Sequence, residues 1–96
     1  MKKVTPRDAD SLYRAILTLK DLGEARRFFR DLLTPAEIEE FARRWKAARM
    51  LADGIPYTQI VSETGLSSTT VARVSRWVKK GTGGYRLLIK RLSGAK

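Results

Sequence analysis

Residues 57–78 contain a glycine followed directly by a leucine and a serine, and this segment restricts the fold more than any other. Gly65 stands where a short helix would have to end in a left-handed residue, a conformation that glycine adopts at little cost. Leu66 follows as the apolar residue of the turn, and the Ser67 hydroxyl can accept a backbone N–H and cap the next helix. The pattern predicts a helix-turn-helix over residues 57–80.

The apolar residues of this segment fall where they would lock the two helices together. These positions are Ile60, Val61, Leu66, Val71 and Val74. At about 100° per residue, Val71, Val74 and Val78 lie within about 60° of one another and form a narrow inward stripe. Small polar and basic residues gather on the opposite side, with the short ones first. We therefore expect the second helix, the recognition helix, to enter the major groove of DNA.

The outward side chains of the motif form the predicted DNA-binding set. Those expected to face the groove are Ser68, Thr69, Ala72, Arg73 and Arg76. Those expected to meet the DNA backbone are Lys79 and Lys80, with Ser67 and Thr70 near the start of the recognition helix and Tyr57 and Thr58 at the start of the first helix. The alternative is an amphipathic helix in a packed bundle that exposes a basic face to solvent.

Positive charge is concentrated near the end of the chain. The formal net charge is +10. Residues 1–72 hold 12 Lys/Arg against 10 Asp/Glu, whereas residues 73–96 hold 8 Lys/Arg and no acidic residue. The excess begins inside the recognition helix, which favours a polyanionic partner. A basic membrane-surface helix would also be cationic, but residues 85–92 are too short and too evenly mixed for one.

Helical spacing and helix-start signals extend over nearly the whole chain. Thr5 and Pro6 predict one helix start, and the Thr34–Pro35–Glu37 pattern predicts a second with a capping box. Gly23 is expected to break the first helical run. Residues 5–54 would then supply the dimerisation and core helices, with the Phe and Trp residues before position 50 in the core. Residues 81–96 would form a glycine joint and a short basic helix, which gives one all-α domain over residues 1–96.

Several classes of protein are excluded by residues that the chain lacks. It has no histidine and no cysteine, so the usual general bases, thiol nucleophiles and metal ligands are missing. We expect no enzyme, no metal site and no cofactor. No apolar run is long enough to span a membrane, and the basic start is not followed by the apolar stretch of a signal peptide. We expect a cytoplasmic protein without a membrane partner.

The stretch LLTPAEIEEFARRWKAARMLADG, followed by the motif above, resembles the tryptophan repressor superfamily, and most of all its small repressor-related proteins (the YerC/YecD group). The resemblance covers about residues 32–80. It implies a small, all-helical, interlocked homodimer that represses transcription at a two-fold symmetric operator.

The resemblance also marks the positions of a ligand pocket. In the repressor, the indole of the co-repressor amino acid lies between two arginines, which correspond to Arg44 and Arg73, and the threonine of LLTP corresponds to Thr34. A glycine and a serine leave room for the ligand there, but this chain has Val74 and Trp77 in their places. These five positions are therefore interpreted as a vestigial pocket in which Trp77 takes the place of free tryptophan.

The combined prediction is a dimeric, sequence-specific regulator that binds double-stranded DNA without tryptophan. Two alternatives stay open: the DNA-end-binding component of a transposition system, and a structural protein that binds nucleic acid without sequence preference. The operator, the regulated genes and any small-molecule effector are not given by the sequence.

Overall fold

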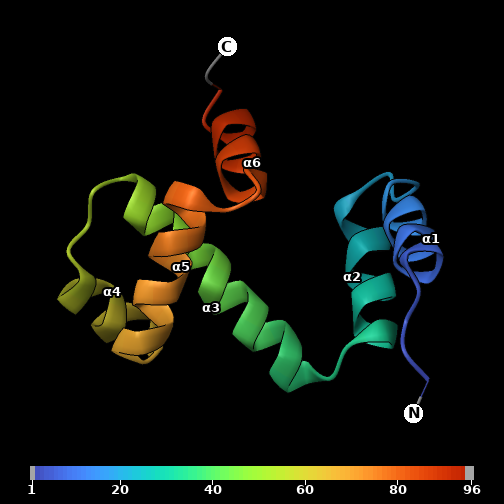
Figure 1. Ribbon diagram of the computed structural model, residues 1–96, viewed down its shortest axis with the longest axis horizontal. Helices are drawn as coiled ribbons and strands as arrows, with labels where there is room; N and C mark the ends of the chain where they lie inside the picture. Colours follow the sequence, from blue (N-terminus) through green and yellow to red (C-terminus); the bar gives the residue numbers. More distant parts are fainter. Residues whose placement is uncertain (1, 95–96) are drawn as a thin grey trace. The chain divides into compact units, whose positions relative to one another are not determined.

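The computed structural model describes residues 2–94, and it is built from helices alone in that range (Figure 1). The helices are α1 (Pro6–Ile16), α2 (Leu22–Leu32), α3 (Pro35–Ala52), α4 (Tyr57–Thr64), α5 (Ser68–Lys80) and α6 (Gly84–Leu92). The all-α class is confirmed. Within the range that the structure describes, no helix has the length and apolar character needed to cross a bilayer.

Two helix starts predicted from the sequence are present with their capping boxes. The Thr5 hydroxyl accepts the Asp8 N–H at 3.1 Å, and the Asp8 carboxylate accepts the Thr5 N–H at 3.1 Å. The same exchange joins Thr34 and Glu37 at the start of α3, with N–O distances of 2.9 and 3.2 Å. Each box satisfies two backbone N–H groups that a helix end would otherwise leave without a partner.

The first helix ends earlier than Gly23, contrary to the sequence prediction. α1 ends at Ile16, and Gly23 lies in the first turn of α2. Asp21 caps that helix, because its carboxylate accepts the Glu24 N–H at 2.8 Å, while the Glu24 carboxylate accepts the Lys20 N–H at 2.9 Å. These two hydrogen bonds at the start of α2 outweigh the weak helix propensity of one glycine.

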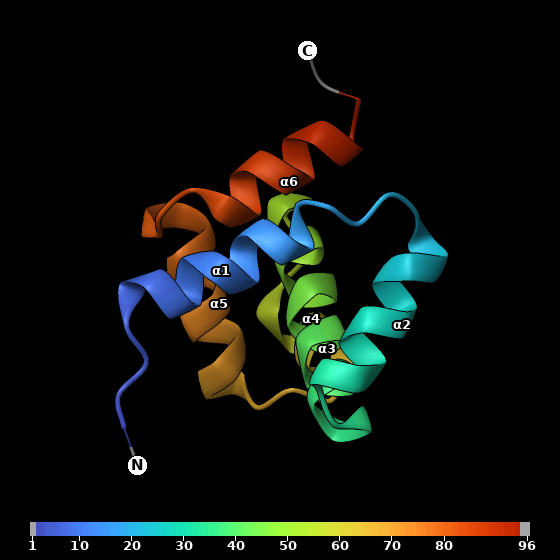
Figure 2. The ribbon, with the colours of Figure 1, turned by 90° about the vertical axis from the view of Figure 1, so that its right-hand side faces the viewer.

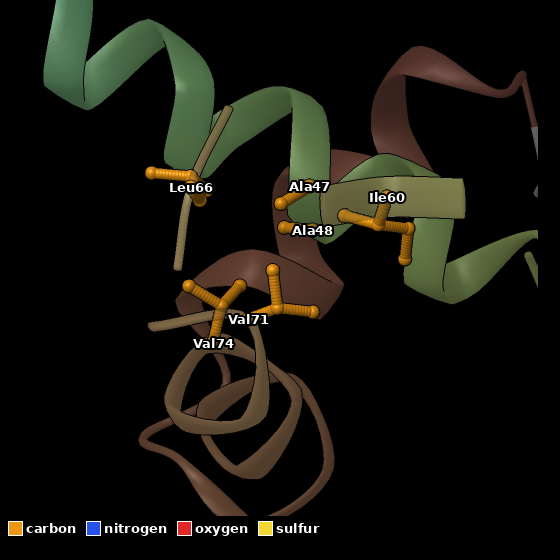
Figure 3. Close-up of a cluster of buried hydrophobic side chains, with 6 residues drawn as sticks. All are labelled: Ala47, Ala48, Ile60, Leu66, Val71 and Val74. Carbon is orange, nitrogen blue, oxygen red and sulfur yellow. The ribbon is translucent and has the colours of Figure 1, made fainter. Parts of the chain in front are cut away.

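Internal contacts divide the chain into two compact units, residues 1–38 and residues 39–96. The second unit contains a hydrophobic core formed by α3, α4, α5 and the turn before α5. Its fully or almost fully buried members are Ala47, Ala48, Ile60, Leu66, Val71 and Val74 (Figure 3). Ala47 and Ala48 are the buried residues that α3 contributes to this core. The prediction of one domain over residues 1–96 stays a prediction.

The first unit has no comparable core. Neither α1 nor α2 contains a buried residue, although both helices are strongly amphipathic. Phe28 and Phe29 make an edge-to-face pair with ring centroids 5.3 Å apart, yet both remain partly exposed. The expectation that the Phe and Trp residues before position 50 lie in the core is wrong for a single copy of the chain, since Phe41 is 50% exposed and Trp45 is only half-buried.

Candidate nucleic-acid interface

The turn between α4 and α5 is fixed by three residues. Gly65 has φ +75° and ψ 4°, so it adopts the left-handed conformation expected from the sequence. Leu66 is buried, and the Ser67 hydroxyl caps α5 by accepting the Thr70 N–H at 3.1 Å. A residue with a Cβ would be strained at Gly65, because a positive φ raises the conformational energy of most residues other than glycine. The helix-turn-helix is confirmed.

Thr64 also contributes to this turn, a role that was not predicted from the sequence. Its buried hydroxyl donates to the Ile60 carbonyl at 2.7 Å and accepts the Leu66 N–H at 3.2 Å. One hydroxyl thereby links the end of α4 to the turn. The signal was present in the sequence as a threonine directly before the helix-ending glycine, a position where a polar side chain can bond to the backbone.

α5 has a buried face and an exposed face. Val71 and Val74 are fully buried and Ser75 almost fully, which places them on the core side. Exposed positions of the predicted DNA-binding set are Ser67, Ser68, Thr69, Ala72, Arg73, Arg76, Lys79 and Lys80. Thr70 is only partly exposed, and its hydroxyl accepts a hydrogen bond from the Ser67 hydroxyl at 2.9 Å. The basic residues therefore all lie on the side of α5 that faces away from the core.

A hydrogen bond between side chains connects the first helix of the motif to the second. The Tyr57 hydroxyl, at the start of α4, donates to the Ser75 hydroxyl in the middle of α5 at 2.5 Å. Ser75 is almost fully buried, so this bond satisfies a polar group that would be costly to leave unpaired. The bond therefore fixes the position of α4 against α5. From the sequence, Tyr57 was predicted only to contact the DNA backbone, and no role was predicted for Ser75.

Tyr57 also lines an open cavity of about 520 Å³ beside the basic face of α5. The other lining residues are Ala72, Ser75, Arg76, Trp77, Lys79 and Lys80. This hollow thus combines a phenol with three cations from the last two turns of α5. The three cations suit a phosphate of a nucleic-acid backbone, which accepts hydrogen bonds and carries negative charge. Thr58, the other predicted backbone contact on α4, is exposed and does not line it.

The five positions interpreted as a vestigial pocket have different surroundings. Val74 is fully buried in the core, and Arg73 is exposed on the outer side of α5. The Arg44 Nε donates to the Glu40 carboxylate at 3.1 Å, one turn earlier on α3. Thr34 caps the start of α3. Trp77 lines two cavities, one on each side of its position on α5.

Trp77 lies on the wall of an apolar groove between α3, α5 and α6. The groove has a volume of about 690 Å³, and its large side chains are Trp45, Trp77, Tyr85, Leu87 and Leu88. The rings of Trp45 and Tyr85 stack with centroids 6.4 Å apart. Burial raises the pKa of the Tyr85 phenol, and the nearby Arg44 guanidinium opposes that rise. Trp77 is 42% exposed, so the chain alone does not enclose its indole.

Comparison with known proteins adds to this geometry. Residues 7–93, nearly the whole chain, match the family model of the Trp repressor protein. The chain belongs to the Trp repressor family. Within that family it is 42% identical over 90 residues to the uncharacterized protein YerC of Bacillus subtilis (strain 168), a match that covers 94% of this chain and 86% of YerC. The predicted membership, including the YerC group, is confirmed.

Solved structures of family members have the same fold. A TrpR-like protein from Eubacterium eligens ATCC 27750 is 38% identical and superposes with a TM-score of 0.87, covering 94% of this chain and 93% of that one. A second solved structure, described as that of a Trp repressor from Staphylococcus aureus, is 35% identical and superposes with a TM-score of 0.87. The match covers 93% of this chain and 89% of that one. The motif formed by α4 and α5 is thus the helix-turn-helix of a family of DNA-binding regulators.

Proposed function

We propose that the protein is a sequence-specific transcriptional regulator, acting as a repressor, that inserts α5 into the major groove of a palindromic operator. The observation that carries the proposal is the division of α5 into two faces. Val71 and Val74 are fully buried, while the basic residues Arg73, Arg76, Lys79 and Lys80 all face solvent. A helix held in this way presents its outer side chains to base edges at its start and middle and to phosphates at its end.

The proposed roles follow the order of side chains along α5. Ser68, Thr69 and Ala72 are short, so they allow the start of the helix to approach base edges closely. Arg73 and Arg76 are placed to read bases, since arginine reaches guanine with two parallel hydrogen bonds. Lys79 and Lys80 are assigned to phosphates beside the cavity that Tyr57 also lines. Ser67 and Thr70 are assigned to phosphates near the start of the helix.

The regulator is proposed to act as a homodimer. α1 and α2 bury none of their residues in one copy of the chain, while large apolar side chains such as Leu12, Leu22 and Leu32 are at least one-third exposed. A second copy would cover these faces, and pairing of two copies is the usual way in which a small chain enlarges its core. Two recognition helices about 34 Å apart would then read two half-sites one DNA turn apart.

DNA binding is proposed not to depend on tryptophan. Val74 occupies core space where the family's ligand pocket requires a small residue, and Arg44 is paired with Glu40. Trp77 adds an indole to the same flank of α5. Isothermal calorimetry should detect no binding of free tryptophan to the protein, and duplex binding should be equal with and without it. Micromolar tryptophan binding would contradict this part of the proposal.

The proposed docking is tested by substitutions in α5. Arg73→Ala and Arg76→Ala should each cost about 1–3 kcal/mol on the preferred duplex if the arginine reads a base, and much less on a scrambled duplex. Lys79→Ala should weaken binding to both duplexes equally and reduce the salt dependence by about one unit. Equal affinity of the wild type and of the Arg73→Ala/Arg76→Ala double variant for the preferred duplex would contradict the docking.

A further inference from the structure

The C-terminal end of α5 is held by an arginine from the next helix. The Arg86 Nε donates to the Val78 carbonyl at 2.8 Å, and its Nη2 donates to the Lys79 carbonyl. The last carbonyls of a helix have no partner within the helix, so both acceptors would otherwise depend on water. The guanidinium has a planar, fixed arrangement of donors, which allows one side chain to satisfy two adjacent carbonyls.

The connection between the two helices brings Arg86 back to these carbonyls. Figure 2 shows the short segment by which the chain passes from α5 into α6. Gly81 caps α5, and a Cβ at this position would clash with the Trp77 carbonyl oxygen. Gly83 precedes α6 with φ +97°, a conformation that favours glycine. These two glycines therefore allow the close turn that places α6 against the end of α5.

The carbonyls that Arg86 contacts belong to the turn that carries the terminal cations of α5. Lys79 and Lys80 are the last two residues of the helix, and both are exposed. A helix end without capping partners frays, so its side chains lose a defined direction. The unpaired carbonyls also form the negative end of the helix dipole, which repels phosphates. A guanidinium on those carbonyls opposes both effects.

We propose that Arg86 is a positioning residue for DNA binding. It fixes the last turn of α5 so that Lys79 and Lys80 meet the phosphates, and it offsets the negative helix end without itself contacting DNA. This inference rests on the proposed function, because it assigns a role to a residue outside the recognition helix in the same DNA complex. The proposed role of Arg86 differs from a phosphate contact, because it depends on the arrangement of the guanidinium N–H donors. A positive charge alone does not suffice for it.

The test compares three variants by titration against one duplex over a range of salt concentrations. Arg86→Ala should weaken binding roughly tenfold, as expected from the loss of charge-assisted hydrogen bonds. The slope of log affinity against log salt should stay unchanged, because no phosphate contact is removed. Arg86→Lys keeps the charge but lacks the two-pronged donor, so it should weaken binding to a similar extent. Arg91→Ala, which removes an exposed arginine from the same helix, serves as the control and should have little effect.

Amide hydrogen exchange without DNA provides the second readout. The Gly81 N–H donates to the Trp77 carbonyl at 2.9 Å in the last turn of α5. Arg86→Ala should speed exchange at Gly81 and Lys80, while the Val71 and Val74 amides stay protected. Exchange that speeds up throughout α5 would show that the variant destabilises the whole helix, and it would overturn the proposal of a local clamp.

Three further results would contradict the proposal in distinguishable ways. Wild-type affinity in Arg86→Ala would show that the clamp has no part in binding. A salt slope reduced by about one unit in Arg86→Ala, with wild-type affinity in Arg86→Lys, would make Arg86 a phosphate contact instead. A wild-type protein that binds no duplex would contradict the proposed function itself, and the DNA role of Arg86 would fall with it.

Discussion

The two compact units of this chain differ in how they bury their apolar residues. Residues 39–96 enclose a core of small and branched side chains, of which Ile60, Val71 and Val74 are fully buried. Residues 1–38 contain two strongly amphipathic helices in which no residue is buried. The core of the second unit therefore supports its helix-turn-helix, whereas the apolar faces of the first unit are proposed to pack against another molecule. A second copy of the chain is the proposed source of that surface.

The largest expected effect comes from placing a charge on an apolar face of the first unit. Leu12→Glu should abolish the dimer, because burying an unpaired carboxylate costs on the order of several kcal/mol. Analytical ultracentrifugation at micromolar concentration should show a dimer for the wild type and for the Leu12→Met control, and a monomer for Leu12→Glu. A wild-type monomer at these concentrations would mean that the first unit needs no partner, and the proposed dimer would be wrong.

The core of the second unit should respond next most strongly. Ile60→Ala should lower the free energy of unfolding by about 2–5 kcal/mol, since it leaves a cavity beside Val71 and Ala47. Val61→Ala, on the partly buried neighbour, serves as the control and should cost clearly less. Urea unfolding followed by circular dichroism measures both. Equal losses in the two variants would show that the core is not organised around Ile60.

The link between α4 and α5 should contribute less than the core. Tyr57→Phe leaves the buried Ser75 hydroxyl without its partner, which should cost about 1–3 kcal/mol. Adding Ser75→Ala to Tyr57→Phe removes the orphaned hydroxyl and should restore part of the loss. A double-mutant cycle by urea unfolding measures the coupling between the two residues. Strictly additive effects would exclude the hydrogen bond as a stabilising link.

The smallest effect is expected at the start of α1, on the surface of the first unit. The backbone N–H and the hydroxyl of Thr5 hold the pKa of Asp8 below its ordinary value. The ionised carboxylate therefore stabilises the helix start above the ordinary pKa of 3.8, and this contribution is lost as the pH falls through the lower pKa of the folded state.

Exchange of the Thr5 amide, followed by NMR during acidification, checks this expectation. After correction for the intrinsic pH dependence of exchange, protection should persist at the ordinary aspartate pKa of 3.8 and fall at lower pH, and it should be absent in Asp8→Ala at all pH values. Equal protection in the wild type and in Asp8→Ala would contradict the capping box.

Much of the second unit could be predicted from local sequence signals. Gly65, Ser67 and the valines of α5 act through backbone conformation, capping and helical spacing, and each of these depends on residues only a few positions apart. The predictions for Thr34 and Glu37 succeeded for the same reason. Ser75 was missed, because its hydroxyl is satisfied by a contact that depends on how α4 packs against α5. Thr64 was missed although both of its hydrogen bonds are local.

Expectations that depend on distant packing were less successful. Phe41 looked like a core residue by its spacing on α3, yet it is half-exposed in a single copy. Helical spacing identifies an apolar face but does not say which molecule covers it. The interaction of Arg86 with the end of α5 was also missed, since it depends on the turn made at Gly81 and Gly83.

Selection of binding sites from random duplex DNA with the wild-type protein tests the central claim most directly. The proposed function predicts a palindromic consensus whose half-sites are centred about 10 base pairs apart, because two symmetry-related α5 helices would read successive turns of the major groove. Enrichment of a single asymmetric site would favour a DNA-end-binding role, as in a transposition system. Binding without enrichment of any sequence would contradict sequence-specific regulation by α5.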